Sequence, residues 1–146
     1  MLSIPRLSLA DAQTLIAGAK KESRRIKVPM CIAVVDESGG LIAFERMDGS
    51  KAVSVQLAQD KAFAAAVSRR PTHTYNERCV PGNLVNGIQN AFGGRFTIVG
   101  GGFPVEGPGG IVVGGIGCSS GTVDQDMATA QAGLRAWAKP PRKGRK

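Results

Sequence analysis

Apolar residues recur at helical spacing in three stretches of the chain. In residues 8–27 they fall at positions 9, 12, 15, 16 and 19, and Ser8 with Asp11 forms a capping-box pattern at the start. A segment that starts at Ser50 or Ser54 and runs to about Ser68 is rich in alanine, which indicates close packing against a sheet. Residues 122–138 begin with two aspartates, which favour the positive end of a helix. We therefore predict three helices over these ranges.

Four runs of apolar and β-branched residues predict strands arranged as two hairpins. Residues 30–36 and 41–47 flank one turn, and residues 99–105 and 109–117 flank a turn rich in Gly and Pro. The second hairpin has glycines at the start of its first run and at the end of its second, and antiparallel pairing brings these together. Glycine lets a backbone approach a ligand, or another part of the chain, closely. The pattern predicts a ligand pocket at one end of a sheet.

The elements follow the order helix, hairpin, helix, irregular segment, hairpin, helix. This order predicts an α+β sandwich in which helices pack on a largely antiparallel sheet. The irregular segment covers residues 72–95 and is interrupted by proline and glycine. A chain of 146 residues suits one domain. We expect that domain to span residues 1–138, with residues 139–146 as a basic disordered tail.

The net charge of +8 at pH 7 arises largely from the end of the chain. Five of the 19 basic residues lie in residues 139–146, which leaves 14 basic and 11 acidic residues in the predicted domain. Such a tail attracts polyanions without specificity. One Trp and one Tyr give little basis for stacking on nucleic-acid bases. Nucleic acid is therefore not an expected partner beyond this non-specific attraction.

The cellular location is predicted from the absence of membrane-spanning and signal-peptide patterns. Its apolar runs are too short to span a bilayer, and its first residues do not follow a signal-peptide pattern. We therefore expect no membrane association and a cytoplasmic location. The three cysteines are widely spaced, without the spacing of a zinc or redox motif. We expect reduced thiols and no metal site.

Three charged residues are the strongest candidates for catalysis. Arg46 and Asp48 flank the end of the second predicted strand, and Lys61 lies in the helix that follows. Arg46 offers a planar fork for a carboxylate, Asp48 could accept a proton, and Lys61 could stabilise an enolate or act as a base. An internal salt-bridge network that fixes the strand-to-helix turn is the alternative.

His73 is the only histidine of the chain, in a polar stretch between two predicted elements. Two interpretations stay open. The residue is either an exposed loop histidine, or a haem ligand or general base.

Several motifs together resemble the GlcG/HbpS-like family. They are VVDESGGL at 34–41, RMDG at 46–49, Lys61-Ala62, GGFP at 101–104, VGGIG at 113–117, and Gly121 with Gln125-Asp126. They occur in the family's order over residues 8–138. The resemblance implies a profilin-like fold, with helices on the faces of a five-stranded antiparallel sheet, and assembly into homo-oligomers.

The same resemblance implies a small-ligand-binding protein, with haem or another tetrapyrrole as the candidate cofactor, because some members bind or degrade haem. The candidate ligand-binding residues are Gly101, Gly102, Phe103, Pro104 and His73. One alternative is a catabolic isomerase, tautomerase or lyase that acts on a small carboxylate or keto compound through Arg46, Asp48 and Lys61. A second alternative is a non-catalytic accessory oligomer. The resemblance implies the fold more firmly than the reaction.

Overall fold

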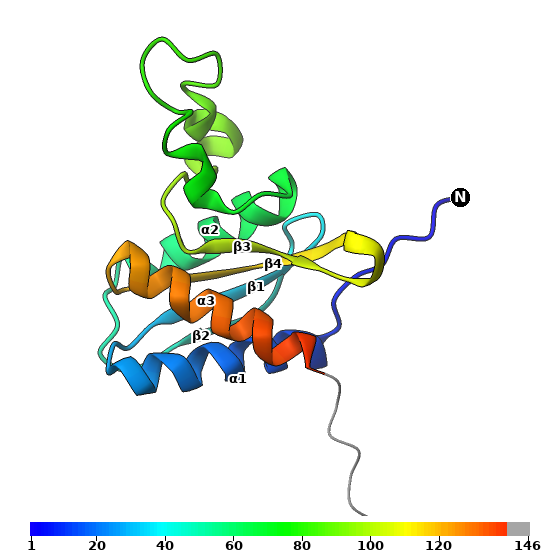
Figure 1. Cartoon of the computed structure of the whole chain (residues 1–146), viewed down its shortest axis with the longest axis vertical. Helices are drawn as coiled ribbons and strands as arrows, with labels where there is room; N and C mark the ends of the chain where they lie inside the picture. Colours follow the sequence, from blue (N-terminus) through cyan, green and yellow to red (C-terminus); the bar gives the residue numbers. More distant parts are fainter. Residues whose placement is uncertain (140–146) are drawn as a thin grey trace, which may run out of the picture.

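A single antiparallel sheet is covered by helices on both faces (Figure 1). The computed structural model describes residues 1–139, so the predicted tail lies almost wholly outside the described residues. The sheet has the strand order β2-β1-β4-β3. The main elements are α1 (Leu9–Ile26), β1 (Cys31–Asp36), β2 (Leu41–Arg46), α2 (Ser54–Ser68), β3 (Gly102–Glu106), β4 (Val112–Ser119) and α3 (Val123–Ala138). These bounds confirm the predicted order of helices and hairpins.

Alternating residues of the strands build two cores on opposite faces of the sheet. On one face Ile32, Val34 and Ile116 pack against α1 and α3. On the other face Cys31, Ala33 and Val35 pack against the alanines of α2. Because those alanines are small, α2 lies directly on the glycines of β4. Within residues 1–139, none of the helices combines the length and the apolar character that a membrane crossing requires.

The expected fifth strand is absent from residues 1–139, where the sheet has four strands. The long segment between α2 and β3 instead forms the 3-10 turns η1 (Thr72–Tyr75) and η2 (Ile88–Gly94) and projects away from the sheet (Figure 1). Positive φ angles at Gly82, Gly87 and Gly93 bend this segment. Repeated turns of this kind prevent the continuous extended backbone that a strand ladder needs. A third turn, η3 (Pro108–Gly110), joins β3 to β4.

The predicted capping box at the start of α1 also links this helix to α3. The Ser8 hydroxyl and amide donate to Asp11 Oδ2 over 2.6 Å and 2.8 Å, and Trp137 Nε1 donates to Asp11 Oδ1 over 3.0 Å. These hydrogen bonds, chiefly the one from the Ser8 side chain, lower the pKa of Asp11 below its ordinary value. Asp11 thus fixes the orientation of the Trp137 ring.

We expect Asp11→Asn to lower the free energy of unfolding by about 1 kcal/mol at neutral pH. Because the pKa of Asp11 is lowered by folding, the contribution of the carboxylate is complete above its ordinary value of 3.8. It is lost as the pH falls through the lower pKa of the folded state. Urea unfolding of both proteins at a series of pH values measures this. The difference should shrink in acid, and a difference independent of pH would contradict the assignment.

Candidate functional site

Lys61 is buried at the end of the sheet and paired with an acid from α3. Its side chain is 1% exposed, and Nζ donates to Asp126 Oδ2 over 2.8 Å and to the Cys118 carbonyl oxygen over 3.0 Å. The second carboxylate oxygen, Asp126 Oδ1, accepts from the Gly121 amide at 2.8 Å. The pair therefore joins α2, β4 and the start of α3. From the sequence, Asp126 was expected only to complement the helix dipole, because nothing local connects residues 61 and 126.

The glycines at the start of β3 make room for this lysine. Gly101 has a φ of +121°, and a Cβ there would lie 2.7 Å from the Cys118 carbonyl oxygen and 3.0 Å from Lys61 Nζ. A Cβ on Gly102 would overlap the Lys61 carbonyl group. The sequence left open whether these glycines approach a ligand or another part of the chain. The close approach seen in the structure is to the chain itself.

Arg46 and Asp48 lie apart from Lys61. They line a shallow surface hollow together with Lys20 and Glu45, whereas Lys61 lines a different hollow with Asp126. Arg46 ends β2, which is separated from β4 by β1. Within residues 1–139 neither Arg46 nor Asp48 forms an ion pair. The structure thus does not assemble the three residues into one cluster, and a catalytic role for each stays a prediction.

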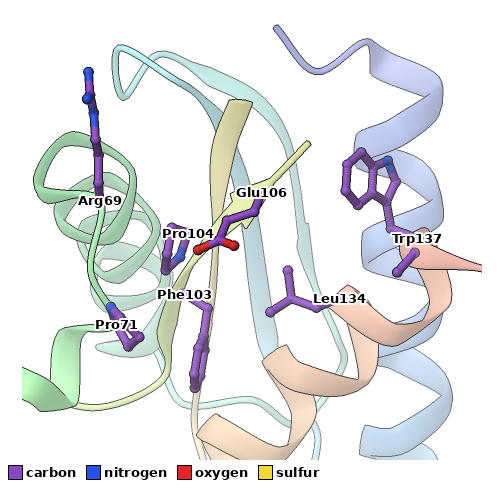
Figure 2. Close-up of a pocket in the computed structure, with 8 residues that line it drawn as sticks. Arg69, Pro71, Phe103, Pro104, Glu106, Leu134 and Trp137 are labelled. Carbon is purple, nitrogen blue, oxygen red and sulfur yellow. The ribbon is translucent and has the colours of Figure 1, made fainter. Parts of the chain in front are cut away.

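A third hollow, of about 310 Å³, lies along the edge strand β3, between the ends of α2 and α3 (Figure 2). Phe103 and Pro104, both predicted as ligand-binding, belong to its wall. Its other lining residues are Arg69, Pro71, Glu106, Leu134, Trp137 and Ala138. The wall is mainly apolar, and Arg69 and Glu106 are its charged residues. The Glu106 carboxylate points towards Pro104, whereas the Arg69 side chain extends away from the other lining residues (Figure 2). Sequence reasoning did not single out Arg69, Leu134 or Trp137, because they come from two helices that only the fold brings together.

His73 lies next to this hollow rather than in an open loop. Its ring centroid is 5.7 Å from that of Phe103, and its buried Nδ1 has no hydrogen-bond partner within residues 1–139. The neighbouring Thr72 hydroxyl donates to the Val99 carbonyl oxygen over 2.7 Å and accepts from the Gly102 amide at 3.1 Å. These bonds hold η1 against the start of β3. His73 is thus a partly buried histidine with an unused ring nitrogen.

Cys118, by contrast, is a thiol of the core. It is fully buried between the sheet and the α1–α3 layer, and burial raises its pKa far above the ordinary value. A thiol that stays protonated is a poor nucleophile. The residue therefore serves packing.

Comparison with known proteins identifies the family. Residues 7–135 match the family model described as haem-degrading protein HbpS-like. The chain belongs to the HbpS-like family. This confirms the resemblance seen in the sequence motifs. The chain is also 34% identical over 131 residues to an uncharacterised 15.0 kDa protein of the dhaT-dhaS intergenic region of Citrobacter freundii, with 90% of this chain and 92% of that one covered.

Two solved structures share the HbpS-like fold of this chain. The crystal structure of protein ORFY from Klebsiella pneumoniae superposes with a TM-score of 0.91 at 32% identity and covers 94% of both chains. The crystal structure of PduOC in complex with haem superposes with a TM-score of 0.84, also at 32% identity, over 90% of this chain and 94% of that one. The α+β arrangement of helices around one sheet is therefore shared with experimentally solved relatives.

Proposed function

We propose that this HbpS-like protein binds haem, or a closely related tetrapyrrole, in the hollow beside β3. The observation that carries the proposal is the haem complex of PduOC, a chain of similar fold and 32% identity. The family description, haem-degrading protein HbpS-like, supports the same ligand class. Haem binding needs a flat apolar wall, a cation for the carboxylates and a side chain for the iron.

The residues along β3 fit these three needs. Phe103, Leu134 and Trp137 form an apolar wall, and the hydrogen bond from Trp137 to Asp11 holds the indole in place (Figure 2). A rigid aromatic side chain contributes binding area at little cost in conformational entropy. The wall suits a flat ligand more than a small polar one.

Arg69 and His73 supply the polar groups. Arg69 lies at the hollow, and its guanidinium can donate two parallel hydrogen bonds to a carboxylate of the tetrapyrrole. His73 contacts the Phe103 ring beside the hollow, and its Nδ1 has no hydrogen-bond partner within residues 1–139. His73 is therefore our candidate side chain for the iron. When bound, haem would supply a redox-active iron, while these residues bind and orient it.

Titration of the purified protein with haem, followed in the Soret region, tests this proposal. We expect saturable one-to-one binding, with a Soret maximum that moves in His73→Ala. Loss of the indole in Trp137→Ala should weaken binding about tenfold. Arg69→Met should also weaken it, whereas Arg70→Met provides a matched control, since Arg70 is exposed at the same helix end but does not line the hollow.

Binding that does not saturate, or that responds to neither His73→Ala nor Trp137→Ala, would overturn the proposed site.

We also propose that the protein forms a homo-oligomer, and light scattering on the purified protein tests this. An accessory role without a ligand would appear as a defined oligomer that takes up no haem.

A further inference from the structure

A second hollow, of about 170 Å³, lies at the end of the sheet, where the buried lysine meets the first turns of α2 and α3. Lys61 and Asp126 line it, with Ser54 from α2 and Ser119 from the end of β4. Exposed valines, Val53, Val99 and Val123, surround these polar groups. The hollow shares no lining residue with the one along β3.

The polar groups of this hollow have hydrogen-bonding capacity that the chain leaves unused. The Lys61 ammonium carries three N–H donors, and the chain accepts two of them. Ser54 and Ser119 are 1% and 3% exposed, yet neither hydroxyl has a hydrogen-bond partner in the part of the chain that the structure describes. Because Lys61 and both serines line the hollow, these unused donors can bind an oxygen atom from outside the chain.

Charge decides what kind of oxygen fits next to Lys61. Asp126 already holds one full negative charge within 2.8 Å of the ammonium, so a second carboxylate at the same place would be repelled. A neutral carbonyl oxygen avoids this repulsion and accepts the free donors. A negative group is favoured farther out. There the exposed Lys51 offers positive charge, and the Lys51 amide is anchored to the Ser120 hydroxyl over 2.9 Å.

We propose that this hollow binds a short-chain oxo carboxylate. The carbonyl oxygen accepts from Lys61 and Ser119, the carboxylate lies towards Lys51, and the short apolar chain contacts the valines at the rim. This site is independent of the tetrapyrrole site. It gives the chain a second ligand class and makes Lys61 a binding residue.

The probe for this site is 2-oxobutyrate, with binding measured by chemical-shift titration of the purified protein. We expect saturable binding, weakened about tenfold in Ser119→Ala and in Lys51→Met. Neither change removes the buried ion pair, so both variants should fold. Lys21→Met is the matched control, because this exposed lysine lies on α1 and does not line the hollow.

Two simpler compounds separate the parts of the ligand. Butyrate lacks the carbonyl group and 2-butanone lacks the carboxylate, so each should bind more weakly than 2-oxobutyrate. Lack of saturable binding, equal binding of butyrate, or binding unchanged in Ser119→Ala and Lys51→Met would each overturn the proposal. Haem titration of Ser119→Ala and Lys51→Met tests whether the two sites are independent. Haem binding should be unchanged in both variants.

Discussion

Lys61→Met is expected to lower the free energy of unfolding by about 3–5 kcal/mol. The substitution leaves Asp126 buried without its cation, and an uncompensated buried charge is one of the costliest defects in a protein core. The Coulombic partner is lost together with the hydrogen bond to the Cys118 carbonyl oxygen. Urea unfolding followed by circular dichroism measures the effect.

The double variant Lys61→Met with Asp126→Asn should recover part of this loss, because it removes both charges together. Lys20→Met is the control, since Lys20 pairs with Glu45 over 2.7 Å at the surface. An exposed pair of that kind contributes at most about 1 kcal/mol. If Lys61→Met cost no more than Lys20→Met, the buried pair would not have the structural role assigned to it.

Gly117→Ala is expected to lower the free energy of unfolding by about 3 kcal/mol, at the upper end of the cost of overpacking. A Cβ at this position would overlap the Ala58 carbonyl oxygen and lie 2.5 Å from the Ala62 amide nitrogen. Both obstacles are backbone atoms of α2, so no side chain can rotate away. The helix would have to move off the sheet, and that would disturb the Lys61–Asp126 pair as well.

Gly109→Ala separates this packing effect from backbone strain. Gly109 has a φ of +74° in the turn between β3 and β4, and a Cβ there would meet no atom within 4 Å. We expect a loss of about 1 kcal/mol, which reflects only the unfavourable backbone conformation. Thermal and urea unfolding of both variants should rank Gly117→Ala as clearly more destabilising. The reverse order would show that α2 does not lie on β4 as described.

The local elements of the fold could be predicted because their signals are local. Ser8 and Asp11 are three residues apart, and the predicted helix over 8–27 agrees with α1 to within a residue at each end. Strand ends were less accurate. The predicted strand over 99–105 begins only at Gly102 in β3. The Thr72 hydroxyl binds the Val99 carbonyl oxygen and the Gly102 amide, and Gly101 has a φ of +121°, which interrupts the extended backbone.

The sequence by itself determined the helices, the two hairpins, the α+β class and Lys61 as a residue of interest, since residue periodicity and capping act over a few positions. Only the tertiary structure decided the partner of Lys61, which is Asp126, 65 residues away, rather than Arg46 or Asp48. It also decided that the sheet formed by residues 1–139 has four strands and that Trp137 lines the hollow beside β3. The physical reason is that contacts between residues far apart in the sequence depend on how whole helices and strands pack. The small residues of α2 and β4 set that packing by letting the helix lie directly on the sheet.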